Sequence, residues 1–148
     1  MNKYNEMRER HQKSINEFEG LGFAFSEEQF NEMCKELGIE PKDAKEKLYR
    51  IGSIGGFVLK DRNDALKELL NKNTAELEKA MKDEDFVFDA FNYELSNHEY
   101  IVTYDATDAL EALGLTNEDI FNNKMYQDQL SKAMKHQIDV YNKREEVE

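Results

Sequence analysis

The run YELSNHEY, residues 93–100, contains the side chains best placed to do chemistry. On a helix, Glu94 and His98 lie four residues apart on one face, which is the spacing of two metal ligands or of an acid/base pair. Asp105 or Asp108, from the following loop, would be a third ligand. A structural interpretation competes, because an imidazolium in the last helical turn interacts favourably with the helix dipole and with Glu94. Both interpretations stay open at this stage.

No motif for a nucleophile or a cofactor accompanies this pair. The chain lacks Gly-x-Ser-x-Gly, His-Glu-x-x-His and Cys-x-x-Cys. The glycine-rich segment 52–56 leads into an expected strand instead of a helix, which favours a hairpin turn over a phosphate-binding loop. Cys34, the single cysteine, lies on an apolar helical stripe and is expected to be a buried, unreactive thiol. We therefore expect no cofactor, and a binding protein more than an enzyme.

Negative charge is concentrated in one part of the chain. The 148 residues have a net charge of -12, yet residues 83–123 contain eleven acidic residues and no Lys or Arg. Such a stretch repels nucleic acid and attracts basic surfaces. We predict a partner with a basic surface, specifically a nucleic-acid-binding protein, and no direct contact with nucleic acid or membrane. The predicted partner-binding residues are Asp85, Asp89, Glu94, Glu99, Asp105, Asp108 and Glu111.

Apolar residues spaced three or four apart predict the helices that would hold these carboxylates. Ser26 and Gln29 form an expected capping box. Other helix boundaries follow from Gly, Pro and Thr at the ends of apolar stripes. The expected helices span residues 2–19, 26–38, 41–47, 64–82, 84–97, 108–113 and 124–144.

Strands are expected on both sides of a turn at residues 53–56, and the β-branched, aromatic run YIVTY at 100–104 is expected to be a third. Residues 23–25 would be a short strand or an apolar plug. The prediction is an α+β fold of about six helices with an antiparallel sheet of two to three strands. One domain over residues 1–148 is expected, with a frayed tail at 145–148. The opening residues lack a secretory signal and no apolar run reaches about 18 residues, which favours the cytoplasm.

The segment from Asp89 to Leu115, DAFNYELSNHEYIVTYDATDALEALGL, together with the hairpin at residues 51–60, resembles a family of small acidic proteins of unassigned function from bacteria and their phages and mobile elements. The resemblance implies no catalytic residue. It implies a bacterial cytoplasm, or the host cytoplasm for a phage protein. It also implies a context in which small proteins inhibit host defence. The segregated charge is similar in kind to that of acidic antirestriction and anti-CRISPR inhibitors, which present carboxylates in place of phosphates.

Three functions follow from these patterns. The first is a non-enzymatic inhibitor that mimics nucleic acid and occupies a basic groove of a bacterial defence nuclease, such as a CRISPR or restriction complex. The second is a metal-binding domain or metal-dependent hydrolase that uses Glu94 and His98. The third is a helical adaptor of unknown partner, in which the first and last helices pack inside one chain or between subunits. An acidic surface that is merely solvated is the simplest competing interpretation.

Overall fold

Contacts divide the chain into two units in the computed structural model, which describes residues 1–147. The inserted unit comprises residues 10–75, and the larger unit comprises residues 1–9 and the chain from Glu76 onward. Helices α1 (Lys3–Asn16) and α4 (Asn63–Ala80) contribute residues to both units. The expectation of one domain over the whole chain stays a prediction.

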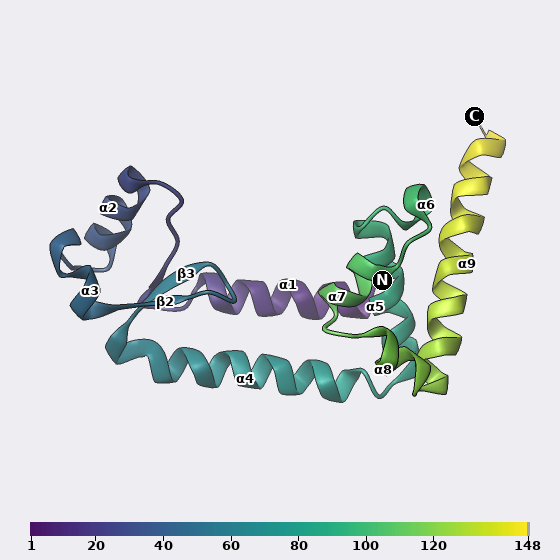
Figure 1. Ribbon diagram of the computed structural model, residues 1–148, viewed down its shortest axis with the longest axis horizontal. Helices are drawn as coiled ribbons and strands as arrows, with labels where there is room; N and C mark the ends of the chain where they lie inside the picture. The colour runs from purple at the N-terminus through teal and green to yellow at the C-terminus, as the bar shows by residue number, and fades with distance from the viewer. Residues whose placement is uncertain (148) are drawn as a thin grey trace. The chain divides into compact units, whose positions relative to one another are not determined.

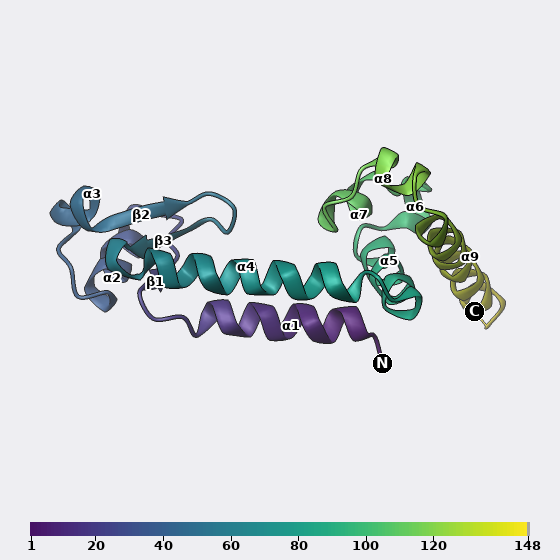
Figure 2. The same ribbon diagram turned by 90° about the horizontal axis from the view of Figure 1, so that it is seen from below.

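The inserted unit contains the predicted hairpin. Strands β2 (Leu48–Ile51) and β3 (Gly56–Leu59) pair antiparallel, with Tyr49 opposite Val58 (Figure 2). The turn between them uses Gly55 at φ 70°, a conformation that a glycine adopts without strain. The glycine-rich segment is therefore the turn of a hairpin.

The third strand of the sheet differs from both candidates in the sequence. Strand β1 (Leu21–Gly22) pairs with β3, which gives the order β1-β3-β2. It ends before residues 23–25, so the expectation of a strand at that segment was wrong. Phe25 is 84% exposed and does not plug the core, whereas Ala24 is partly buried against the core of the inserted unit. Gly56 explains the close approach of the strands, because an added Cβ there would lie 3.1 Å from the Gly22 carbonyl oxygen.

The helices of the inserted unit begin where the capping residues predict. Ser26 caps α2 (Glu27–Glu36) by accepting a hydrogen bond from the Gln29 N–H at 3.2 Å. The Gln29 side chain accepts from the Phe25 N–H instead of returning to Ser26. Cys34 of α2 is fully buried, and burial raises the pKa of its thiol. The remaining helical segments of this unit are η1 (Pro41–Asp43), α3 (Ala44–Lys47) and η2 (Lys60–Arg62).

The larger unit is built around α5 (Glu84–Asn97), whose bounds match the predicted helix. Asp83 caps it by accepting from the Phe86 N–H. Phe91 and Leu95 are fully buried, and each contributes about 1.5–3 kcal/mol on leaving water. The helices that follow α5 are α6 (Tyr100–Thr103), α7 (Thr107–Ala112), α8 (Asn117–Phe121) and α9 (Lys124–Val147). Figure 1 shows α9 packed beside α5.

Residues 100–103 of the run YIVTY are helix α6, so the expectation of a strand at residues 100–104 was wrong. Tyr100 is buried in the core of the larger unit, and the Tyr104 N–H donates to the Tyr100 carbonyl at 2.7 Å. Strand propensity depends on a partner strand and on packing. In the observed fold the burial of Tyr100 decides the local structure instead.

The fold class agrees with the sequence, because the described residues form a mainly helical α+β structure with one small antiparallel sheet. Helix α9 continues to Val147, and Glu148 of the expected tail lies outside the described residues. Among the described residues, no helix is both long enough and apolar enough to cross a membrane.

Helix α6 is bracketed by two residues in the left-handed region, Glu99 and Tyr104, each at φ 55°. Glycine adopts this conformation with less strain than other residues. We therefore expect Glu99→Gly to increase the free energy of unfolding by about 0.5–1 kcal/mol. Urea denaturation of this variant checks it. The exposed helical residue Ser96 is the control, and Ser96→Gly should decrease the free energy of unfolding.

Candidate functional site

The carboxylate of Glu94 is buried in the larger unit, with only 2% of the residue exposed. Its Oε1 accepts a hydrogen bond from the Tyr4 hydroxyl at 3.2 Å. Its Oε2 lies 3.2 Å from His98 Nε2. Each oxygen therefore has a partner, which is the condition for keeping a carboxylate away from water.

Contacts at the start of α1 place Tyr4 beside the Glu94 carboxylate. Asn2 donates from its side-chain amide to the Asp89 carbonyl at 2.8 Å, and the Lys3 N–H donates to the Asp89 carboxylate at 2.8 Å. A negative charge at a helix N-terminus is stabilised by the helix dipole. Asp89 therefore links the first turn of α1 to α5 through these two hydrogen bonds.

The Tyr4 ring packs against other aromatic rings. The Tyr4 ring lies 5.6 Å from the Tyr93 ring, and the Arg8 guanidinium stacks over Tyr93 at 5.3 Å. Burial, followed by the negative charge of Glu94, raises the pKa of Tyr4 well above its usual range. Tyr4 therefore stays a hydrogen-bond donor at all physiological pH values.

The third residue of the suggested metal site is engaged elsewhere. The Asp105 carboxylate accepts from both the N–H and the hydroxyl of Thr107, and the bond to the Thr107 hydroxyl is the main reason that the pKa of Asp105 is lowered. Residues 1–147 contain no group of three or more His, Cys, Asp or Glu side chains that could hold a metal ion. The structure thus brings Glu94 and His98 together, as the spacing predicted, but does not add Asp105 to them.

Most acidic side chains of residues 83–123 face solvent. Glu94 is buried and Asp89 is half-buried, whereas the other nine are exposed. No ion pair within the described part of the chain involves any of these nine. We call them the acidic set: Asp83, Glu84, Asp85, Glu99, Asp105, Asp108, Glu111, Glu118 and Asp119.

A groove opens between α7, α8 and α9 in the same unit. Its volume is about 430 Å³. We call it the α7–α9 groove. Its apolar lining consists of Ala106, Leu110, Ile120, Phe121, Leu130 and Met134.

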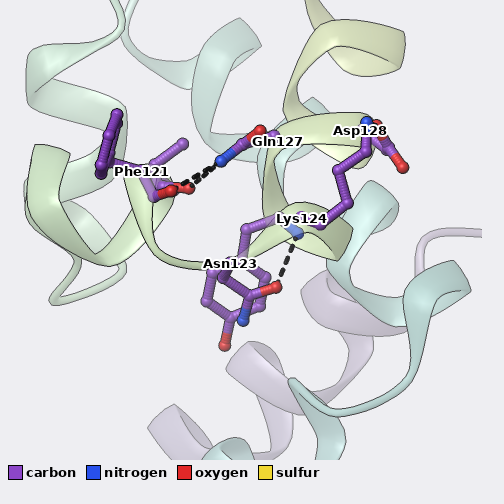
Figure 3. Close-up of polar contacts among 7 residues, drawn as sticks. Phe121, Asn123, Lys124, Gln127 and Asp128 are labelled. Carbon is purple, nitrogen blue, oxygen red and sulfur yellow. Dashed lines mark hydrogen bonds and ion pairs between the residues drawn. The ribbon is translucent and has the colours of Figure 1, made fainter.

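Phe121, at the edge of this groove, is 81% exposed, and its backbone is fixed from two directions. Gln127 of α9 donates from Nε2 to the carbonyls of Ile120, at 3.0 Å, and Phe121, at 2.8 Å (Figure 3). Thr116 and Asp119 form a reciprocal capping box at the other end of α8. The five residues of α8 therefore present an exposed phenylalanine on a backbone that is held at both ends.

Negative charge extends across this region to α9. Lys124 is the first base after the acidic stretch, and its ammonium lies 2.7 Å from the Asp128 carboxylate (Figure 3). The pKa of Tyr126 is raised by burial and by the charge of Asp119. The first cation after the acidic stretch is thus paired within α9.

A model of a protein family of unknown function, DUF7659, matches residues 3–136. The chain belongs to this family. The match confirms an uncharacterised family over most of the chain, while the bacterial or phage origin stays a prediction. No curated protein and no solved structure matches the chain. Membership of DUF7659 thus leaves the function to be argued from the residues themselves.

Sequence reasoning on this DUF7659 chain missed Tyr4 and Phe121. Tyr4 falls within the helix expected at residues 2–19, and nothing local indicated that its hydroxyl reaches a carboxylate ninety residues away along the chain. Phe121 carried a signal, because it is a large apolar residue in the polar run NEDIFNNK. An apolar residue among polar neighbours at a helix end is exposed unless another element covers it.

Removal of the Tyr4 hydroxyl should destabilise the larger unit. Tyr4→Phe leaves Glu94 Oε1 buried without this donor, so we expect the free energy of unfolding to fall by about 1–3 kcal/mol. Urea denaturation measures the change. The control is Tyr93→Phe, whose hydroxyl accepts from Arg8 at an exposed site and which should change stability by less than about 0.5 kcal/mol. Equal effects of the two substitutions would contradict a special role for Tyr4.

Stability should also decrease in alkaline solution. The unfolded chain ionises Tyr4 near the ordinary pKa of 10.0, whereas the folded chain keeps it protonated to a higher pH. The folded state therefore binds more protons above pH 10, and its stability falls as the pH rises further. Denaturation at several pH values should show a smaller fall for Tyr4→Phe than for the wild type. Some fall remains in the variant, because the pKa of Tyr126 is also raised.

Proposed function

We propose that this protein is a non-enzymatic inhibitor whose acidic set occupies the nucleic-acid-binding groove of a partner protein. The observation that carries the proposal is the exposure of nine carboxylates, none of which forms an ion pair with a described Lys, Arg or His. A soluble surface ordinarily mixes both signs of charge. A surface of one sign favours partners of the opposite sign and increases the rate at which they associate.

Burial decides to which of the predicted residues we assign the contact. Glu94 is buried and Asp89 binds the first turn of α1, so neither presents a carboxylate to a partner. The remaining predicted residues are exposed, and we assign the contact to Asp85, Glu99, Asp105, Asp108 and Glu111. The four other members of the acidic set add to the same negative potential.

The class of partner follows from the sign of the charge. A protein surface that recognises a phosphate backbone is rich in Lys and Arg. Carboxylates spaced along helices compete with phosphates for such a surface. We propose a bacterial defence nuclease, such as a CRISPR or restriction complex, as the target, and a bacterial cytoplasm as the place of action. The similarity in kind to acidic antirestriction and anti-CRISPR inhibitors supports this choice.

Two alternatives have less support. A metal-binding domain or metal-dependent hydrolase would need Glu94 and His98 to face a ligand, but Glu94 already bonds to both Tyr4 and His98. A helical adaptor would use α1 and α9 between subunits. The apolar residues Met7 and Met134 on these helices pack against the core of the larger unit, which favours the intramolecular use of both.

Nuclease-treated bacterial lysate provides the test, because the treatment empties basic grooves of nucleic acid. Tagged wild-type protein should capture a nucleic-acid-binding protein at low salt and lose it at high salt, since screening weakens contacts between exposed charges. Wild-type protein should then displace a labelled duplex from the purified partner. The acidic variant carries Asp85→Asn, Glu99→Gln, Asp108→Asn and Glu111→Gln, and we expect it to need at least about tenfold more protein for the same displacement.

The control variant removes the same number of charges from the inserted unit. It carries Glu→Gln substitutions at four exposed positions: Glu28, Glu32, Glu36 and Glu68. It should displace the duplex as well as the wild type does. If both variants displace the duplex equally poorly, the effect depends on total charge alone. If the acidic variant displaces the duplex as well as the wild type does, the proposed function is contradicted.

A further inference from the structure

We infer that the α7–α9 groove receives the apolar face of a basic amphipathic helix of the partner, with Phe121 as the central contact. This inference rests on the proposed function, because it specifies which element of the partner meets the acidic set. It goes further in one respect. It assigns the recognition of the partner to an apolar contact in addition to charge.

The shape of the site favours an apolar side chain as its occupant. Phe121 and Ile120 of α8 line the groove together with Leu110 from α7 and Leu130 and Met134 from α9. Grooves between helices that are lined by such residues bind amphipathic helices through side chains at helical spacing. Large aromatic residues also dominate the binding energy of protein interfaces.

Phe121 is prepared for such a contact. It is 81% exposed, which leaves most of the ring available to be buried by a partner. Its carbonyl is fixed by Gln127, and the start of α8 is fixed by Thr116 and Asp119. Because the backbone is already ordered, binding requires little loss of conformational entropy beyond that of the side chain.

Charge at the groove selects a basic occupant. Asp105 directly precedes the lining residue Ala106, while Glu118 and Asp119 directly precede the lining residue Ile120. No Lys or Arg occurs between residues 83 and 123. Lys124 is paired with Asp128, so its charge does not offset these carboxylates. An apolar floor beside unpaired carboxylates matches a helix with Leu-type residues on one face and Lys or Arg beside them.

A nucleic acid mimic that acts by charge alone has no use for this groove. Phosphate-binding surfaces are polar and strongly basic, and an exposed phenylalanine adds nothing to binding such a surface. The groove therefore indicates that the partner contributes a helix with an apolar face, beside or within its basic surface. A second copy of the chain is the other occupant to be tested.

Two synthetic peptides test the inference directly. One is a helical peptide of leucine and lysine with its leucines on one face, and the other has the same composition in scrambled order. Fluorescence anisotropy should show the helical peptide binding the wild type about tenfold more tightly than the scrambled one. Phe121→Ala should remove most of that difference. Phe25→Ala is the matched control, because Phe25 is 84% exposed in the inserted unit, and it should leave both affinities unchanged.

The outcomes separate this inference from the proposed function. If the wild type binds both peptides equally and Phe121→Ala changes neither affinity, the groove is not the contact, while binding through charge stands. If neither peptide binds at low salt, both ideas are overturned. If sedimentation shows a dimer of the wild type that Phe121→Ala dissociates, the occupant is a second copy and the inference is wrong. Circular dichroism of each variant confirms that the fold is retained.

Discussion

The buried carboxylate of Glu94 is the constraint that organises the larger unit. A charge at 2% exposure destabilises a fold by several kcal/mol unless it is fully hydrogen-bonded. Its two partners come from the first turn of α1 and from the end of α5, through Tyr4 and His98. The first turn of α1 must therefore pack against α5 for the Glu94 carboxylate to be fully hydrogen-bonded. This requirement explains why residues 1–9 belong with the chain from Glu76 onward and not with the residues that follow them directly.

The acidic residues of the chain consequently have two different functions. Asp89 and Glu94 each accept a hydrogen bond that joins α1 to α5. Carboxylates on α7 and α8, such as Glu111 and Glu118, are exposed and make no ion pair with a described residue. Net charge alone does not separate these groups. Asp89 and Glu94 hold the fold together and are not exposed, whereas the exposed carboxylates are available to a partner.

Local signals in the sequence were sufficient wherever the determining contact is local. The bounds of α5 follow from the Asp83 cap and the apolar spacing after it, and the hairpin turn follows from its glycines. The same rules failed at residues 100–104, where the burial of Tyr100 overrides strand propensity. They also missed the hydroxyl of Tyr4, because its partner is separated from it by ninety residues. The spacing of Glu94 and His98 predicted that the two side chains lie together. The burial of Glu94, which the spacing does not predict, determines whether the pair is structural or binds a ligand.

Charge and shape contribute differently to recognition by such a surface. Exposed carboxylates act over roughly a Debye length, about 8 Å at physiological salt, so they accelerate encounter and exclude acidic partners without fixing one orientation. An apolar side chain acts only in contact, and it therefore defines register. Helix α8 combines an exposed charge with an apolar contact. Asp119 completes its capping box, and Phe121 is its last residue and lines the groove. A five-residue helix is too short to be stable alone. Its hydrogen bonds to Gln127 and Thr116 give the contact a fixed position on an otherwise long-range electrostatic surface.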